Sequence, residues 1–517
     1  MRSYLPIAFA LILLVLIPAA FAADLYVDNL LTGDCIQTYS IADRNCSGTD
    51  GNAFVVPQDA ADAVVAGDTV LFRRGTYALD GVPPIQITSN SGTADAKITL
   101  RNYGAEEVII DAANVNSIWN GFHGIYVQYS DYIVLQGLTV RNSPEEGIQF
   151  YGSDYAEVLN CTVHSNVGPG IYFYEASDYG LVSDCEVYGN GGMGITMLES
   201  DYAEVSNNLV YNQNVSNPEA SDGIAFGNSD YGLIKGNIVF NNWDDGIDSC
   251  CGSMYSTIED NRVFNSGNDP SGEGDGNGIK VSTANFVGGG GGHVVVRNVV
   301  FDNQWTGFDQ DKAIGYPQNF FYNNTAYNNR NGFFMDAPAL PQDEDAILYN
   351  NIASGNSYRD LRRSNDLAVN YSNFNLWGDG LFVPGMDENS LSGDPGFNNP
   401  SLVVDTTFEA GWTIEQKMEH LRGQIRDKFS LGQGSQAIDN GFLIAGYHCA
   451  TAGPDPLGNC REWSGLAPDI GPIEFSGSSC VDTTALLSHI SNWEQGSITM
   501  PYLISRIAAW KAGTGCP

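Results

Sequence analysis

A dipeptide of glycine followed by isoleucine or phenylalanine recurs at short, nearly regular intervals through the middle of the chain. Successive glycines are 23, 23, 24, 29, 23, 32, 29 and 25 residues apart. They are Gly124, Gly147, Gly170, Gly194, Gly223, Gly246, Gly278, Gly307 and Gly332. A period of this length indicates a solenoid, in which each repeat forms one coil that stacks on its neighbours.

The segments between the repeated glycines are short, alternate between apolar and polar residues, and are rich in Val, Ile, Tyr and Phe. Tyr132 to Val140 and Val205 to Tyr211 are examples. This pattern is typical of β-strands, with three short strands and three bends in each coil. The sequence therefore predicts an all-β chain folded as a right-handed parallel β-helix, whose rungs stack about 4.8 Å apart.

One column of the repeat holds asparagine on six rungs, just before a Val-aromatic step. These residues are Asn208, Asn237, Asn261, Asn298, Asn324 and Asn351. Stacked amides can donate to one another along the column and also bind backbone groups at the bend. Cys161 and Cys185 occupy the same column on neighbouring rungs, where they form either a disulfide or two free thiols that fill the interior.

The two ends of the chain differ from the repeat. Residues 57–65 read as a short amphipathic helix that caps the first open coil, and residues 415–428 as an inserted helix. We expect the β-helix domain to span residues 23–475. Residues 476–517 then form a small C-terminal helical hairpin, tied by Cys480 and Cys516.

The first 22 residues predict export. Arg2 precedes an apolar run that ends at Ala20-Phe21-Ala22, which is the pattern of a secretory signal peptide and too short for a membrane span. We therefore expect a secreted protein without a membrane span, and a monomer. The ten cysteines fit an oxidising compartment, where Cys35 with Cys46 and Cys449 with Cys460 are expected local pairs.

The chain is strongly acidic, with 61 Asp and Glu against 23 Lys and Arg and a net charge of −38. Nucleic acid is excluded as a partner, because binding phosphates requires basic patches. An acidic polysaccharide would also be repelled. A bound cation would remove that repulsion locally.

The candidate site residues lie between residues 222 and 280, within the repeat. In each Gly-Ile strand the isoleucine points inward and the next residue outward. This outward column contains Asp248 and, one rung on, Lys280, while Asp222, Asp244 and Asp245 stand at the bends beside them. Four carboxylates this close require a cation, and hard oxygen ligands favour Ca²⁺.

Lys280 is the candidate catalytic base. Partial burial near Ca²⁺ should lower the pKa of its amine, although Asp248 opposes this shift unless calcium neutralises it. With a uronate carboxylate on the cation, Lys280 would remove the C5 proton and the C4–oxygen bond would break by β-elimination. Trp243 and Trp305 flank these strands and either stack on sugar rings or pack at bends.

The motifs resemble those of the family 9 polysaccharide lyases, which are pectate lyases and their relatives. The resemblance rests on Asp222-Gly223, on residues 243–248 and 277–280, and on Gly307-Phe308-Asp309-Gln310 followed by residues 322–326. It implies a parallel β-helix, Asp222, Asp244, Asp245 and Asp248 as calcium ligands, and Lys280 as the Brønsted base. The pair Cys250-Cys251 and the Gly-Asp-rich loop 267–276 depart from the pattern and leave the identity of the uronan open.

Three other functions fit parts of the pattern. A β-helix glycoside hydrolase would use Asp244 and Asp245 as acid and base. A C5-epimerase would abstract the same proton and return one to the other face. A non-catalytic surface or adhesion β-helix would use calcium as a clamp. The single lysine above the aspartates favours the lyase.

Overall fold

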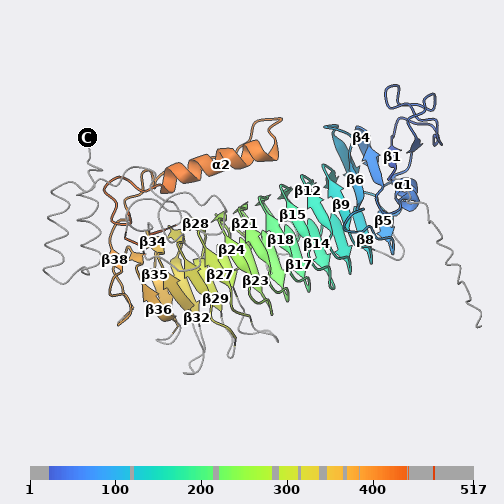
Figure 1. The fold of residues 1–517 in the computed structure, drawn as a ribbon. Helices are drawn as coiled ribbons and strands as arrows, with labels where there is room; N and C mark the ends of the chain where they lie inside the picture. The colour runs from blue at the N-terminus through green and yellow to red at the C-terminus, as the bar shows by residue number, and fades with distance from the viewer. Residues whose placement is uncertain are drawn as a thin grey trace, which may run out of the picture.

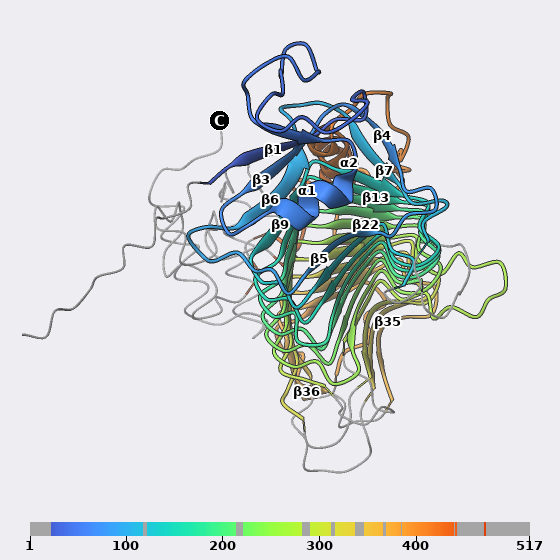
Figure 2. The same ribbon diagram turned by 90° about the vertical axis from the view of Figure 1, so that its right-hand side faces the viewer.

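The structure is a computed structural model that describes residues 22–116, 121–213, 221–281, 290–311, 316–336, 346–364, 369–383, 385–438, 440–441 and 470–471. Within these residues the strands form three parallel sheets of 14, 13 and 11 strands. Successive rungs follow one long axis (Figure 1), and the view along that axis shows the sheets as the walls of a coil (Figure 2). The predicted right-handed parallel β-helix is confirmed.

Each complete rung contributes one strand to each sheet, and the rungs at the two ends are incomplete. Sheet 1 consists of β1 (Asp24–Val27), β2 (Asn52–Phe54), β3 (Thr69–Phe72), β6 (Ile98–Asn102), β9 (Ile133–Gln136), β12 (Glu157–Leu159), β15 (Leu181–Ser183), β18 (Glu204–Ser206), β21 (Leu233–Lys235), β24 (Thr257–Glu259), β27 (Val294–Val296), β30 (Phe320–Tyr322), β33 (Ala346–Tyr349) and β36 (Val369–Asn373). Sheet 2 consists of β4 (Gly75–Ala78), β7 (Val108–Asp111), β10 (Thr139–Arg141), β13 (Thr162–His164), β16 (Glu186–Tyr188), β19 (Leu209–Tyr211), β22 (Ile238–Phe240), β25 (Arg262–Phe264), β28 (Val299–Phe301), β31 (Thr325–Tyr327), β34 (Ile352–Ser354), β37 (Leu376–Trp377) and β38 (Leu391–Ser392). Sheet 3 consists of β5 (Ile85–Thr88), β8 (Ile125–Gln128), β11 (Ile148–Tyr151), β14 (Ile171–Tyr174), β17 (Ile195–Leu198), β20 (Ile224–Gly227), β23 (Ile247–Cys250), β26 (Ile279–Val281), β29 (Thr306–Asp311), β32 (Asn331–Asp336) and β35 (Arg359–Arg363).

The core fills the inside of the coil. Sheet 3 carries the Gly-Ile repeat, and the isoleucines pair in register, as Ile148 does with Ile171. These side chains are fully buried, which stabilises the fold by about 1.5–3 kcal/mol for each Val, Leu, Ile or Phe. Two segments expected as single strands are in fact two strands each. Tyr132–Val140 bends at Gly137, and Val205–Tyr211 bends at Asn207, both with positive φ.

The predicted asparagine column is present inside one bend. The amide of Asn237 donates to the oxygen of Asn261 at 3.0 Å, and the amide of Asn261 donates to Asn298 at the same distance. Each amide also donates to a backbone carbonyl, as Asn261 does to Ile234 at 2.9 Å. The column therefore satisfies buried polar groups of the bend on every rung it crosses.

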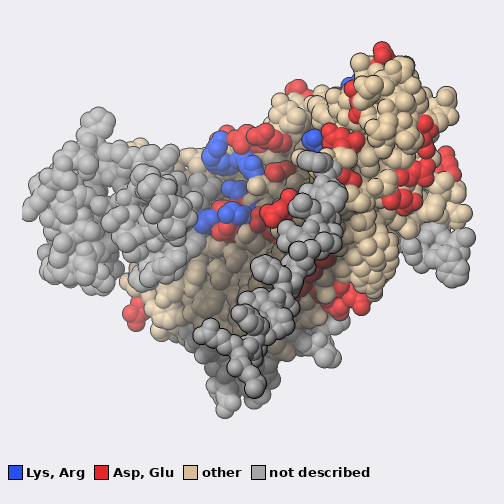
Figure 3. Space-filling view, turned by 45° about the vertical axis from the view of Figure 1, so that its right-hand side comes forward, with Lys and Arg blue, Asp and Glu red and all other residues tan. Residues whose placement is uncertain are grey.

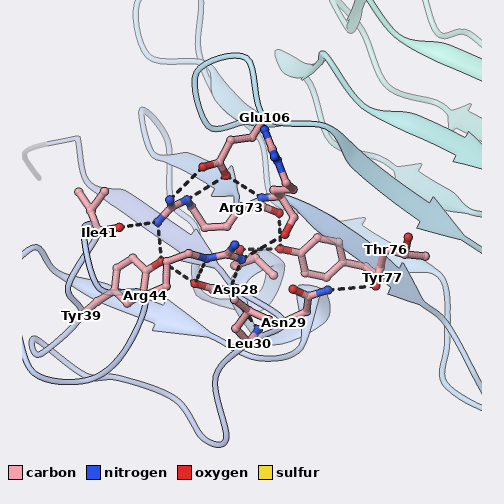
Figure 4. A network of polar contacts seen from close by, with 12 residues as sticks. Asp28, Asn29, Leu30, Tyr39, Ile41, Arg44, Arg73, Thr76, Tyr77 and Glu106 are labelled. Carbon is pink, nitrogen blue, oxygen red and sulfur yellow. Dashed lines mark hydrogen bonds and ion pairs between the residues drawn. The ribbon is translucent and has the colours of Figure 1, made fainter. Parts of the chain in front are cut away.

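Polar contacts secure the N-terminal end of the coil (Figure 4). The buried carboxylate of Asp28 accepts hydrogen bonds from the Tyr39 hydroxyl at 2.7 Å and from the Arg44 guanidinium at 2.6 Å. Arg73 donates to Glu106 through two nitrogens, at 2.9 and 3.0 Å. The predicted capping helix, α1 (Pro57–Ala63), lies across this end (Figure 2). It covers strands that would otherwise expose an edge.

The predicted inserted helix, α2 (Ile414–Phe429), lies along the outside of the coil (Figure 1). Its buried face consists of Met418, Leu421, Ile425 and Phe429, and it packs on outward residues of sheet 2 such as Phe264 and Phe301. An ion pair of 2.7 Å between Lys417 and Glu186 joins the helix to an earlier rung. α2 therefore covers part of the outer face of sheet 2.

The cysteines are in part as expected. Cys35 and Cys46 form the predicted disulfide, and the adjacent Cys250 and Cys251, which had no assignment, form another. Cys161 and Cys185 are free and buried. The pairs Cys449–Cys460 and Cys480–Cys516, the signal peptide and the C-terminal hairpin lie outside the described residues, apart from Ala22 at the end of the signal.

The acidic composition is visible on the surface. Figure 3 shows one face, on which Asp and Glu are spread widely while Lys and Arg gather mainly in one area. Such a surface repels an anionic polymer over most of its extent, so a binding region for one needs local positive charge. No helix within the described residues combines the length and the apolar character that crossing a membrane requires.

His293 makes the stability of the coil sensitive to acid. Its ring is fully buried, and burial lowers its pKa from 6.5 to about 4. Between these values the unfolded chain binds a proton that the folded chain does not, so stability is lost as pH falls from 6.5 to 4. Urea unfolding should show that the wild type loses about 3 kcal/mol more than His293→Asn between pH 7 and pH 4. Parallel pH profiles of the two proteins would contradict this.

Candidate active site

Three neighbouring strands of sheet 3 carry the candidate site on their outer face. In β20, β23 and β26 the isoleucines Ile224, Ile247 and Ile279 are fully buried in the coil. Alternation therefore turns the next residue of each strand outward. Asp248 of β23 pairs directly with Lys280 of β26, one rung on.

The bends before these strands supply three more carboxylates. Asp222 precedes β20, and Asp244 and Asp245 precede β23. One carboxylate oxygen of each lies within 4.8 Å of the others. All three side chains are buried, and Asp248 is 9% exposed. Asp222, Asp244 and Asp245 therefore form one cluster on two successive rungs, and Asp248 is near enough for its charge to repel that of Asp222.

Backbone N–H groups hold the three bend carboxylates in place. The Oδ1 atom of Asp222 accepts from the N–H of Asp245 at 3.0 Å. Asp244 and Asp245 accept in the same way from residues of the next rung, at 2.6 Å from Asp275 and 2.7 Å from Asn277. The stacked backbone thus fixes the position of each carboxylate before anything binds to it.

The cluster is electrostatically strained as long as no cation is bound. Burial, and then repulsion from the neighbouring carboxylates, raises the pKa of Asp222 well above its ordinary value. The same two causes raise the pKa of Asp244 to about 8. Burial also raises the pKa of Asp248 to about 7, although Lys280 opposes the shift. Among the described residues, the buried Oδ1 of Asp248 has no hydrogen-bond partner.

Lys280 lies at the edge of this cluster. Its Nζ atom is 3.4 Å from Oδ2 of Asp245 and 2.8 Å from Oδ2 of Asp275. Burial lowers the pKa of the amine, but the surrounding carboxylates raise it by more, so that the net shift is upward. The lowered pKa expected from the sequence assumes bound Ca²⁺ and stays a prediction; without the ion, three carboxylates act on the amine and raise its pKa.

Asp222, Asp244, Asp248 and Lys280 line one cleft of about 590 Å³. One part of its lining is apolar and includes Tyr172, Leu198 and the Cys250–Cys251 disulfide. Because Gly227 stands between Leu198 and Cys250 in the register, the floor has no side chain at that point. A cleft with carboxylates and an amine beside an apolar wall suits a ligand that is both charged and ring-shaped.

Sequence reasoning missed Asp275. It lies in the loop 267–276, which was recognised only as Gly-Asp-rich, yet it binds Lys280 with its side chain and Asp244 with its backbone. No periodic signal places it there, because the loop interrupts the repeat. Asp309 was noted only within the resemblance; it pairs with Lys280 on the following rung, and burial raises its pKa well above its ordinary value.

The chain resembles known proteins over most of its length. Residues 39–351 match the family described as the Pel9A-like, right-handed β-helix region. Pectate lyase PEL9 of Emericella nidulans is 26% identical over 411 residues, which cover 71% of this chain and 88% of that protein. Pectate lyase L of Dickeya chrysanthemi is 26% identical over 329 residues, 60% of this chain and 70% of that one.

A solved structure agrees in fold. The crystal structure of pectate lyase Pel9A superposes with a TM-score of 0.55 and 19% sequence identity, and the match covers 88% of this chain and 97% of that one. At this identity the likeness concerns the fold. The family match, in contrast, spans more than half of the sequence and includes every strand that carries the candidate site. The chain therefore belongs to the Pel9A-like family of right-handed β-helix proteins.

Proposed function

We propose that the chain is a polysaccharide lyase that cleaves a uronic acid polymer, of the pectate type, by calcium-assisted β-elimination. The observation that carries the proposal is an amine beside a buried acidic cluster in an open cleft, with Lys280 Nζ 3.4 Å from Asp245. The relatives named pectate lyases support the same reaction and substrate class.

The acidic cluster fits calcium. Its donors are all carboxylate oxygens, which Ca²⁺ prefers, and they are too closely packed to remain charged without a cation. The buried Oδ1 of Asp248, which has no hydrogen-bond partner among the described residues, is a further donor. Asp222, Asp244, Asp245 and Asp248 would hold the ion. Calcium, when bound, would supply the charge that attracts a uronate carboxylate and makes the C5 proton more acidic.

Lys280 is the base in this proposal. Its neutral Nζ takes the proton from C5, and the electron pair of that C–H bond forms a double bond between C4 and C5. The C4–O bond breaks, its electron pair leaves with the glycosidic oxygen, and that oxygen then takes up a proton. No water is consumed, so one product carries an unsaturated sugar at its new end.

The base must lose its proton before it can act. In the chain by itself the carboxylates of Asp245, Asp248 and Asp275 raise the pKa of Lys280. Once a cation neutralises the first two, their effect on the amine weakens. The burial of Lys280, which lowers its pKa, is then opposed mainly by Asp275. The same four aspartates thus prepare both the metal site and the base.

The direct test is the ultraviolet absorbance of the unsaturated product. The purified protein should raise this absorbance on at least one polymer in a panel of uronans. A chelator should abolish the increase, and added calcium should restore it. Shorter polymers without absorbance would indicate a hydrolase, and inverted C5 centres at constant polymer length an epimerase. Calcium-dependent thermal stability without turnover on any uronan would indicate a binding protein.

We also propose that the protein is secreted and acts as a monomer on an acidic polysaccharide. Two disulfides, Cys35–Cys46 and Cys250–Cys251, support an oxidising compartment. The signal peptide over residues 1–22 and the separate C-terminal appendage over residues 476–517 remain predictions from the sequence.

A further inference from the structure

Beyond Lys280 the outer face of sheet 3 changes from acidic to basic and aromatic. The outward column that contains Asp248 and Lys280 continues through Asp309, Phe334 and Arg362. Arg362 is therefore three rungs beyond Lys280, roughly 14 Å along the axis at the usual strand spacing. Its guanidinium lies 4.2 Å from the centre of the Phe334 ring.

A second column runs beside the first, at the bends that precede these strands. The backbone N–H of Trp305 donates to Gly276, next to the Asp275 that binds Lys280. The backbone N–H of Arg330 donates in turn to the carbonyl of Trp305 at 2.9 Å, and the backbone N–H of Tyr358 donates to the carbonyl of Arg330 at 2.8 Å. Trp305, Arg330 and Tyr358 thus occupy three successive rungs that start directly beyond the candidate site.

The two columns meet through their side chains. The guanidinium of Arg330 lies 3.8 Å above the Trp305 ring, and those of Arg330 and Arg362 lie 6.0 and 5.9 Å from the Tyr358 ring. Arg359 contacts the same ring at 5.5 Å. Three arginines therefore surround one exposed tyrosine, on the same face as the cleft and within three rungs of it.

These arginines are available to an anion. Among the described residues, no ion pair of 4.0 Å or less involves Arg330, Arg359 or Arg362. A guanidinium that lies flat on an aromatic ring keeps the N–H donors at its edge free for a carboxylate. Unpaired positive charge of this kind stands out in a chain with 61 acidic and 23 basic residues.

We propose that Arg330, Arg359 and Arg362, with Trp305 and Tyr358, form a subsite that binds the carboxylates and rings of an anionic polysaccharide. The polymer lies along the coil axis, with arginines for its carboxylates and exposed aromatic rings for its sugars. The choice of a uronate as ligand rests on the proposed function. The subsite explains how a chain of net charge −38 holds an acidic polymer, because the binding surface is locally positive where the rest is negative.

The test compares the binding of long and short uronates. Calorimetry on full-length Lys280→Ala protein, which prevents turnover, should show that adding Arg330→Gln and Arg362→Gln weakens binding of a galacturonate decamer at least about tenfold. The preference for the decamer over a trimer should fall with it, because the trimer cannot span the cleft and the subsite together. A carboxyl-reduced decamer should bind equally to parent and variant, since it lacks the groups that the arginines recognise.

Arg101→Gln is the matched control, because Arg101 is an exposed arginine on sheet 1. It should leave decamer binding unchanged, and the melting temperatures of all variants should match that of the parent. An unchanged decamer affinity in the double variant, or an equal loss for decamer and trimer, overturns the subsite even if the wild type cleaves uronans. Arginine-dependent binding without any unsaturated product from the wild type supports the subsite and removes the proposed lyase function instead.

Discussion

Replacing Lys280 with alanine should lower the rate of uronan cleavage by about a thousandfold, within the range that a positioned base contributes. The loss should appear in kcat, because the amine acts on the C5 proton in the transition state. Calcium should still bind, since the four aspartates remain and one positive charge beside them has been removed. Ultraviolet turnover assays and calcium titration of the same sample check both halves.

Two further variants test whether the loss of activity is specific to the amine of Lys280. Lys280→Arg keeps the charge but cannot lose its proton at neutral pH, so it should be as inactive as the alanine variant. Lys235→Ala, which removes a lysine paired with Glu259 on sheet 1, should keep full activity. A small primary amine in solution should restore part of the activity of Lys280→Ala alone. Wild-type turnover in Lys280→Ala would remove Lys280 from the mechanism.

The coil could be predicted from the sequence because its information is local and periodic. The rungs repeat an inward isoleucine or phenylalanine after a glycine, so that the register of sheet 3 follows from counting, and the pairing of Asp248 with Lys280 follows with it. The two helices were also predictable, since each has its own amphipathic pattern. Bends within apparently continuous strands were harder to predict, because residues such as Asn207 adopt positive φ without any glycine to mark the turn.

A second column of stacked amides was missed although its signal was present. Five residues after the predicted column, a further series of polar side chains recurs, and the structure stacks them at the opposite end of the same strands. Asn166 donates to Asn190 at 2.9 Å, and Asn303 donates to Asn329 at 3.0 Å. Gln213 and Ser266 interrupt the run of asparagines in this second column, which makes its period harder to recognise.

The site was predictable only as far as the repeat reaches. The four aspartates and Lys280 lie on repeated positions, whereas Asp275 lies in an insertion whose path no period determines. Its carboxylate is one reason why the pKa of Lys280 is raised rather than lowered in the chain by itself. Likewise the packing of α2 on sheet 2 joins residues that are 231 positions apart, Lys417 and Glu186, and no local pattern indicates which sheet the helix covers.

The second large effect concerns the metal site. Asp222→Asn should invert the order of stability between variant and wild type when calcium is added. Without calcium, burial and three neighbouring carboxylates raise the pKa of Asp222, so its ionisation destabilises the folded chain as pH rises above the ordinary value for aspartate. An amide removes that cost and can still accept the N–H of Asp245 through its oxygen. The metal-free variant should therefore melt above the metal-free wild type.

With calcium at about a hundred times the dissociation constant of the wild type, the wild type should gain about 2.7 kcal/mol. A variant that binds about a hundredfold more weakly should gain only about 0.4 kcal/mol at that concentration. Thermal melts with chelator and with calcium should therefore cross, while Asp95→Asn, at an exposed position, should follow the wild type in both. Removing a purely structural carboxylate would lower the melting temperature under both conditions. The effect of the substitution on the melting temperature changes sign only if the carboxylate destabilises the empty site and binds the ion in the occupied site. If the variant and the wild type differ by the same amount with and without calcium, Asp222 does not bind the ion.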